Sequence, residues 1–310
     1  MTIVFKVSDK LKEKMIEYYT PLRREKTPPY AVFQAMDADT IVTLYESGKV
    51  MFQGISADID AKMWTEMEQK LTGKKINIYE NEKKKEKEKK ERTVLYKKST
   101  IGSDEVGTGD YFGPIVVTAA YIPKEQIPFI DELGVRDSKT LTDARIMEIA
   151  PTLIKEVKHC TFILKNKEYN KYQKMGFNMN KIKAILHNKV LVEMKKRTPS
   201  YDAIVVDQFV YPQKYFEHIK EATEKVTNID FTTKAESKCA SVAAASCISR
   251  YIFLLQMDEL SKEFSTPLLK GAGEDVDKLA AKIVQTYGRE KLEEIAKLNF
   301  KNTEKLNQYL

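Results

Sequence analysis

The decisive stretch of the chain is Asp104-Glu105-Val106-Gly107-Thr108-Gly109-Asp110. It follows residues 100–103, a short run typical of a β-strand. Two adjacent carboxylates are therefore expected where a strand runs into a glycine-rich turn. Neighbouring side chains within a strand point to opposite faces. At a strand end this alternation relaxes, so we expect both acids to converge on one point.

The composition of this turn suits a phosphodiester substrate. Carboxylates hold hard divalent cations, and glycines let backbone N–H groups approach a ligand closely. An acidic pair in an ordinary surface loop is the alternative, so the rest of the chain has to decide between the two.

The overall composition is that of a globular protein with a mild basic excess. The 310 residues are enough for two domains, and a hydrophobic content of 42% is enough for packed cores. A formal net charge of +7 fits a polyanionic partner such as nucleic acid. An ordinary lysine-rich surface would give the same excess.

Cysteine, histidine and hydropathy patterns favour a reduced, cytoplasmic protein without membrane contact. None of the three cysteines forms a CxxC pair, and the N-terminus lacks the apolar run of a signal peptide. The longest apolar stretch, residues 240–257, contains Arg250 and several serines, which predicts a buried helix. The three histidines lack the spacing of zinc ligands.

A charged segment divides the chain. Residues 82–92 contain no apolar side chain, which is typical of a linker or a solvated helix, although such a segment could also contact a phosphate backbone. We therefore expect an N-terminal domain at residues 1–80, a charged linker at 81–97 and a larger domain at 98–310.

The N-terminal domain is predicted to be a small α+β unit. Strands are expected at residues 3–7, 30–36, 40–45 and 50–53. Helices are expected at residues 10–19, with Ser8 or Asp9 as N-cap, and at 57–71. The second helix has apolar positions at Ile59, Met63, Met67 and Leu71. Trp64 is predicted to be a core residue rather than a platform for base stacking.

The C-terminal domain mixes both kinds of element. Strands are predicted at residues 113–122, paired with the strand that carries the acids, and at 160–164 and 203–206. Helices are predicted at residues 180–197, 240–255, 278–286 and 289–298.

Further acids follow the same logic as Asp104. Asp207 ends a hydrophobic strand, and ligands bind at the carboxyl ends of strands in open α/β sheets. Glu236 lies between Lys234 and Lys238, which suit phosphate contacts. The alternatives are a capping acid for Asp207 and a favourable first-turn charge for Glu236. The pair Ser138-Lys139 also suits a phosphate contact, and the alternative is that it lies in an ordinary solvent-exposed loop.

Four ordered motifs carry a family resemblance. DEVGTGDYFGP (104–114), RDSKTL (136–141), VVDQF (205–209) and KAESK (234–238) resemble the type 2 ribonuclease H family. Residues 269–273 and 297–303 resemble its ribonuclease HIII branch. The match spans about residues 98–310, and residues 1–80 resemble the TATA-binding-protein-like domain that precedes the catalytic part in that family.

This resemblance implies an α/β fold, a ribonuclease H-like mixed sheet with flanking helices, preceded by the small α+β domain. The implied catalytic and metal-binding residues are Asp104, Glu105, Asp207 and Glu236. A glutamate at the last position favours the HIII branch. The implied substrate contacts are Gly107, Thr108, Gly109, Ser138, Lys139, Ser237 and Lys238. The glycine turn would read the ribose 2′-OH. The tyrosine that the HII branch uses at RNA–DNA junctions has no secure match here.

The implied activity is endonucleolytic cleavage of the RNA strand of RNA–DNA hybrids by two Mg²⁺ or Mn²⁺ ions, leaving 5′-phosphate and 3′-hydroxyl ends. We expect a monomer without an obligate protein partner. The N-terminal domain is expected to grip the hybrid through residues such as Lys6, Lys49 and the linker lysines.

Two other functions are compatible with parts of the pattern. One is a non-catalytic hybrid-binding protein with a relic site, although a relic has no reason to keep four mutually repelling acids. The other is a Mg²⁺-dependent phosphotransferase, but the chain lacks the G-x-x-x-x-G-K-[ST] pattern and carries acids where that loop presents lysine.

Overall fold

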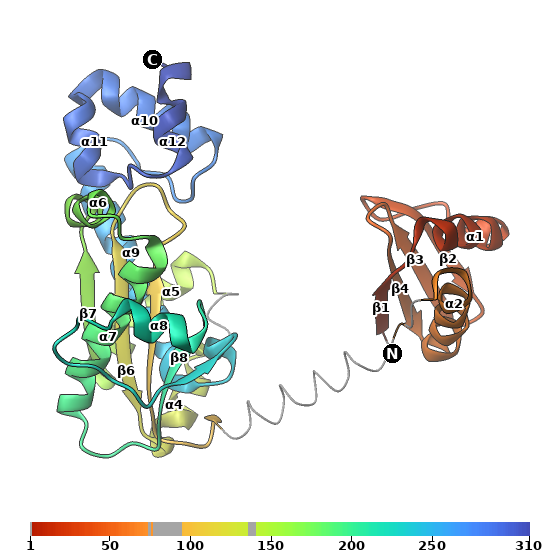
Figure 1. The fold of residues 1–310 in the computed structure, drawn as a ribbon, viewed down its shortest axis with the longest axis horizontal. Helices are drawn as coiled ribbons and strands as arrows, with labels where there is room; N and C mark the ends of the chain where they lie inside the picture. Colours follow the sequence, from red (N-terminus) through yellow and green to blue (C-terminus); the bar gives the residue numbers. More distant parts are fainter. Residues whose placement is uncertain (1, 74–75, 77–94, 136–140) are drawn as a thin grey trace. The chain divides into compact units, whose positions relative to one another are not determined.

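Two compact units make up the chain, residues 1–90 and 91–310. The computed structural model describes residues 2–73, 76, 95–135 and 141–310 (Figure 1). The expected linker at 81–97 lies largely outside the described residues, as do Ser138 and Lys139.

The N-terminal unit is a four-stranded antiparallel sheet with strand order β1-β4-β3-β2 and two helices. Its elements are β1 (Thr2–Lys6), α1 (Asp9–Tyr19), β2 (Ala31–Asp37), β3 (Thr40–Tyr45), β4 (Lys49–Gly54) and α2 (Ala57–Thr72). The Ser8 hydroxyl caps α1 by accepting a hydrogen bond from the backbone N–H of Leu11 at 3.3 Å. Ser8 is thus the N-cap, one of the two residues expected there.

The buried face of α2 agrees with the predicted stripe at Met67 and Leu71, which pack against the core, and differs from it at Ile59 and Met63. Ile59 is 67% exposed and Met63 39% exposed, whereas Trp64 is only 2% exposed. The indole N–H of Trp64 donates to the Tyr19 hydroxyl at 2.9 Å, which confirms Trp64 as a core residue. Glu68 is also buried, because its carboxylate accepts from the backbone N–H and the hydroxyl of Ser8.

The second unit is a five-stranded mixed sheet with strand order β7-β6-β5-β8-β9. Its strands are β5 (Thr100–Val106), β6 (Ile115–Ile122), β7 (Lys158–Leu164), β8 (Ala203–Asp207) and β9 (Asp230–Thr232). β5 pairs antiparallel with β6, as predicted, and parallel with β8. The parallel pairing places the carboxyl ends of β5 and β8 at the same edge.

Two long helices cover the faces of this sheet. α9 (Ala240–Glu263) packs on β5 and β6, and α7 (Met179–Arg197) packs on β5, β6 and β7 (Figure 1). Gly102 permits the close approach of α9, since a Cβ atom at this position would lie 2.5 Å from Ser241 Oγ and 2.6 Å from the backbone nitrogen of Val242. Small residues in α9 therefore bring the helix backbone down onto β5.

The remaining helices flank the sheet or follow it. They are α4 (Ile127–Glu132), α5 (Asp143–Glu156), α6 (Asn166–Lys174), α8 (Pro212–His218), α10 (Glu274–Tyr287), α11 (Arg289–Ile295) and α12 (Lys301–Lys305). α5 packs on α9, and α10 packs on α11 and α12. The mixed sheet with flanking helices confirms the predicted fold class.

Among the described helices, α9 alone has the length and apolar composition that would let it cross a membrane. Its apolar side chains are instead mostly buried within the unit, including Val242, Ile248 and Phe253. This is the packing of a core helix, as the sequence predicted.

Candidate active site

Asp104 and Asp207 lie at neighbouring positions at the edge of the sheet. In the parallel register Ser103 pairs with Val206, so the two acids are the next residues on adjacent strands. Burial, followed by the nearby charge of Glu105, raises the pKa of Asp104 to about 8, and Asp207 adds to this effect. A hydrogen bond from Ser246 and one from the backbone N–H of Glu105, at 2.9 Å, act in the opposite direction.

Glu105 faces the opposite side of the sheet from Asp104. β5 continues to Val106, which pairs with Val116, so the alternation of a regular strand persists through both acids. β5 therefore extends beyond the predicted run 100–103, and the relaxed alternation that was expected to bring both acids to one point does not occur. The Glu105 carboxylate accepts from His187 Nε2 at 2.8 Å and forms an ion pair with Lys183.

These partners stabilise the charge of a carboxylate that is only 11% exposed. Burial by itself would raise the pKa of Glu105, but the hydrogen bond and charge of His187 together with the Lys183 ammonium hold that pKa below its ordinary value. Glu105 is thus kept as a carboxylate by residues of α7.

Sequence reasoning missed Lys183 and His187. Both lie on α7 four residues apart, so they share one face of the helix. His187 also bonds Ser103 at 2.7 Å through Nδ1, and the Lys183 ammonium lies 4.1 Å from the centre of the Phe209 ring. The available signal was a lysine and a histidine one helical turn apart on the helix predicted at residues 180–197.

Glu236 is held close to Asp207 by its own short helix. The backbone N–H of Ala235 donates to Asp207 Oδ1 at 2.9 Å, and Ala235–Ser237 form a 3₁₀ turn. Lys234 precedes this turn with φ +54°, a left-handed conformation that costs roughly 1 kcal/mol for a side chain other than glycine. The Glu236 side chain is 6% exposed.

Ser237 and Lys238, the two expected substrate contacts that follow Glu236, form hydrogen bonds within the protein. Lys238 is 5% exposed, and its ammonium donates to Thr232 Oγ1 at 3.0 Å. The Ser237 hydroxyl donates to the backbone carbonyl of Lys234 at 2.9 Å. Lys238 thereby fixes β9 beside Asp207, whereas the sequence suggested a phosphate contact for this lysine.

The glycine turn is closely packed at its start and open at its tip. Gly107 has φ +94°, and a Cβ atom here would overlap the carbonyl oxygen of Pro114 and lie 3.1 Å from Phe253. No heavy atom lies within 4 Å of the position that a Cβ atom on Gly109 would take. The tip, which includes the half-buried Thr108, is accessible to a ligand.

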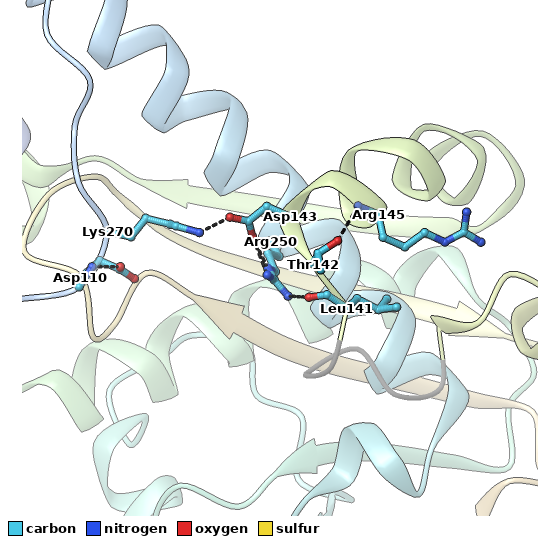
Figure 2. A network of polar contacts seen from close by, with 8 residues as sticks. Asp110, Leu141, Thr142, Asp143, Arg145, Arg250 and Lys270 are labelled. Atoms are coloured by element: carbon cyan, nitrogen blue, oxygen red, sulfur yellow. Dashed lines mark hydrogen bonds and ion pairs between the residues drawn. The ribbon is translucent and has the colours of Figure 1, made fainter.

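A polar network anchors the start of α5, immediately after residues 136–140 (Figure 2). Arg250 donates to Asp143 Oδ1 from Nε at 3.0 Å and from Nη2 at 2.6 Å, and to the Leu141 carbonyl at 2.8 Å. Lys270 pairs with the second oxygen of Asp143. Burial would raise the pKa of Asp143, but Lys270 and Arg250 hold that pKa below its ordinary value.

The donor chemistry of the four acids fits a hard divalent cation, because carboxylate oxygens are the ligands such ions prefer. Within the described residues, however, no group of three or more His, Cys, Asp or Glu side chains is arranged to hold a metal ion. Asp104 and Asp207 lie at neighbouring positions on adjacent strands, while the Glu105 carboxylate is engaged by Lys183 and His187.

A hollow opens directly beyond Asp207. Its volume is about 420 Å³, and its lining consists of Gln208, Phe209, Val210, Tyr211, Lys214 and Thr233. Tyr211 is 77% exposed. An open, mainly apolar surface with an aromatic ring therefore lies beside the acidic edge.

Comparison with known proteins decides the family. The family profile described as Ribonuclease HII matches residues 101–303. Ribonuclease HIII of Bacillus mycoides (strain KBAB4) is 41% identical over 310 residues, which cover 98% of this chain and 97% of that protein. The chain belongs to the ribonuclease HIII family. It is a ribonuclease H enzyme.

Other comparisons agree with this ribonuclease HIII assignment. Ribonuclease HIII of Listeria monocytogenes (serotype 4b, strain CLIP80459) is 41% identical and covers 94% of both chains. The crystal structure of Bst-RNase HIII in complex with Mn²⁺ matches with a TM-score of 0.69 at 36% identity, covering 99% of this chain and 98% of the other. A domain of unknown function matches residues 2–83. The TATA-binding-protein-like character of that region stays a prediction.

Proposed function

We propose that this ribonuclease HIII family member is an endonuclease that cleaves the RNA strand of RNA–DNA hybrids with two Mg²⁺ or Mn²⁺ ions, leaving 5′-phosphate and 3′-hydroxyl ends. The observation that carries the proposal is the position of Asp104 and Asp207 directly after the paired residues Ser103 and Val206 on adjacent parallel strands, within a chain whose relatives are ribonucleases HIII. The Mn²⁺ complex of Bst-RNase HIII supports the choice of ion.

Asp104, Asp207 and Glu236 would hold the ions, and Glu105 would join them if its carboxylate turned from Lys183 and His187 toward the side that Asp104 faces. When bound, such ions activate a water molecule for attack on the phosphorus and offset charge on the leaving oxygen. The protein's own contribution is to keep the acids in place and charged. Burial raises the pKa of Asp104, so a cation beside it would favour its carboxylate form. Lys183 and His187 already hold Glu105 in that form.

The backbone of Gly107, Thr108 and Gly109 is proposed to read the ribose 2′-OH, which distinguishes RNA from DNA. The open surroundings of Gly109 leave room for this contact. Ser138, Lys139, Ser237 and Lys238 are proposed contacts to the substrate backbone. For Lys238 such a contact requires its ammonium to exchange Thr232 for a phosphate.

The proposed setting is a monomer in the cytoplasm, bound to a hybrid duplex without an obligate protein partner. The basic excess of the sequence supports a polyanionic partner. Within the described helices, only α9 meets the criteria for a membrane span, and it packs in the core.

The test compares cleavage of a labelled RNA–DNA hybrid with that of duplex RNA and duplex DNA, each with and without Mg²⁺ or Mn²⁺. We expect metal-dependent cleavage of the hybrid alone. Metal-independent hybrid binding without cleavage would instead support the relic hybrid-binding protein, and nucleotide hydrolysis without nucleic acid would support a phosphotransferase.

Replacing Asp104 or Asp207 with asparagine should abolish turnover and largely spare hybrid binding, because the amide keeps the shape but loses the charge that holds a cation. The expected loss in kcat is roughly a thousandfold or more. The matched control is Asp230→Asn, an exposed acid on β9 that should retain full activity. Near-normal cleavage by Asp104→Asn or Asp207→Asn would refute the assignment of these acids.

A further inference from the structure

Lys297 is a fully buried lysine whose ammonium is bound by backbone carbonyls. Its exposure is 0%, and Nζ donates to the carbonyl oxygen of Asp110 at 2.8 Å and to that of Gly113 at 2.5 Å. Burial lowers the pKa of Lys297 to about 7, and only the charge of Asp110 acts in the opposite direction. An apolar side chain of similar length would avoid the cost of burying the charge, but it would remove the two hydrogen bonds that the ammonium donates to these carbonyls.

The two carbonyls bound by Lys297 belong to the segment that follows the glycine turn. The same segment, residues 110–113, forms further hydrogen bonds with the C-terminal part of the chain. The Lys297 backbone N–H donates to the Tyr111 carbonyl at 2.9 Å, and the Gly113 N–H donates to the Ile295 carbonyl at 2.9 Å. The base of the turn is therefore clamped against residues 295–297.

A second connection reaches the same base from residue 271. The Tyr111 N–H donates to the Gly271 carbonyl at 2.8 Å, and the Gly271 N–H donates to Asp110 Oδ1 at 2.6 Å. Figure 2 shows the hydrogen bond to the Asp110 carboxylate beside Lys270, whose side chain extends to Asp143. The turn is thus fixed at its base by residues far away in the sequence, while its tip at Gly109 is open.

We propose that Lys297 is a positioning residue that holds the base of the glycine turn, so that the backbone of residues 107–109 keeps a fixed place relative to Asp104. The proposal rests on the proposed function, in which this backbone recognises the ribose 2′-OH. Lys297 acts through the carbonyls of Asp110 and Gly113 and has no contact with substrate. A misplacement of about 1 Å at such a site costs up to a hundredfold in rate.

The experiment measures kcat/KM on two hybrids with Mn²⁺. One hybrid has an intact RNA strand, and the other lacks the 2′-OH on the nucleotide 5′ to the preferred cleavage site. The ratio of the two values reports recognition of the 2′-OH, and it does not change when a variant merely contains less folded enzyme. The variants are Lys297→Met, which removes the ammonium, and Asp110→Ala, which removes the acceptor for Gly271.

We expect the ratio of kcat/KM on the intact hybrid to kcat/KM on the hybrid that lacks the 2′-OH to fall by roughly tenfold or more in Lys297→Met, because the backbone of residues 107–109 would be displaced. Lys301→Met, an exposed lysine on α12, is the matched control and should keep the wild-type ratio. If Lys297→Met does not fold, Asp110→Ala carries the same expectation of a reduced ratio.

Two negative outcomes are distinguishable. If wild-type enzyme cleaves no hybrid, or cleaves both hybrids equally, the proposed function or its 2′-OH recognition fails. If wild-type enzyme discriminates and a folded Lys297→Met keeps the full ratio, the positioning role of Lys297 is overturned. If Lys297→Met does not fold and Asp110→Ala keeps the full ratio, the base of the turn does not position residues 107–109, and the role of Lys297, which acts through that base, is overturned with it.

Discussion

Glu105 is a nearly buried carboxylate that is stabilised by an ion pair and a hydrogen bond. Its carboxylate is 11% exposed, and Lys183, which is 12% exposed, supplies the opposite charge. Charges so far out of water are stable only when paired and hydrogen-bonded. The cluster of Glu105, Lys183 and His187 therefore keeps a largely buried acid ionised on the α7 face of β5.

Lys183→Met should destabilise the protein by about 3 kcal/mol, because it leaves the buried Glu105 charge with only His187 as a partner. The measurement is the free energy of unfolding from urea denaturation at neutral pH. The double variant Lys183→Met/Glu105→Gln should recover much of the loss, since the unpaired charge is then absent.

Lys195→Met is the matched control for this prediction. Lys195 is exposed in the last turn of the same helix, so its removal should change stability by less than about 0.5 kcal/mol. Equal losses in Lys183→Met and Lys195→Met would show that the buried ion pair contributes nothing specific.

At the scale of elements, the contact between β5 and α9 positions Asp104. The Ser249 hydroxyl of α9 donates to the Asp104 carbonyl at 3.2 Å, and Ser246 bonds its carboxylate. This contact depends on Gly102, two residues before the acid, because α9 leaves no space for a Cβ atom there.

Gly102→Ala should therefore cost about 1–3 kcal/mol through overpacking, and it should also lower kcat because α9 would shift away from Asp104. Thermal unfolding and hybrid cleavage measure the two effects. Gly273→Ala is the control, since a Cβ atom at Gly273 meets no heavy atom within 4 Å. Wild-type stability in Gly102→Ala would contradict the close contact between helix and strand.

The hydrogen bonds between residues 110–113 and residues 295–297 give a second prediction at this scale. The pKa of Lys297 is lowered to about 7 from 10.5, so the unfolded chain binds more protons than the folded one between these pH values. Stability should therefore rise with pH across this window, by at most about 1.4 kcal/mol per pH unit from this residue. Below pH 7 the contribution is constant.

Lys297→Met lacks this titration. Urea denaturation at pH 7 and pH 9 should show a smaller gain with pH in Lys297→Met than in the wild type. Lys301→Met should show the wild-type gain. Parallel pH dependences in wild type and Lys297→Met would mean that the Lys297 ammonium is not buried as described.

These elements also show how far local sequence information extends. The strand that carries Asp104, its antiparallel partner and the strand that ends at Asp207 follow from runs of β-branched residues, which are local signals. The partners of Glu105 were not predictable in this way, since Lys183 and His187 come from a helix some eighty residues later. Likewise, the burial of Trp64 and Glu68 on α2 was not predictable from the helix itself, since their partners are Tyr19 and Ser8.

At the scale of the whole molecule, each unit has its own hydrophobic core. One cluster of buried residues lies entirely within the N-terminal unit, from Ile3 to Trp64, and the others lie within the second unit. Because neither core depends on residues of the other, we expect the ribonuclease H-like unit to fold without residues 1–80.

The N-terminal unit carries a charge pattern that suits a polyanion. Lys6 and Lys49 are directly opposite each other on β1 and β4, and both are exposed. Like charges in this arrangement destabilise a sheet, and a bound phosphate would relieve the repulsion. This pattern supports the proposal that the unit grips the hybrid.

Deleting residues 1–80 should raise KM and weaken hybrid binding while leaving kcat on saturating hybrid largely unchanged, because the acids and the glycine turn lie in the second unit. The dependence of binding on salt should become shallower, by about 0.7–0.9 in log–log slope for each phosphate that the protein no longer neutralises. In the full chain, Lys6→Met/Lys49→Met should reproduce part of this change. The control Lys10→Met/Lys14→Met removes two exposed lysines from α1 and should leave the slope unchanged. Equal salt-dependence slopes in the wild type and in Lys6→Met/Lys49→Met would show that Lys6 and Lys49 do not contact the hybrid.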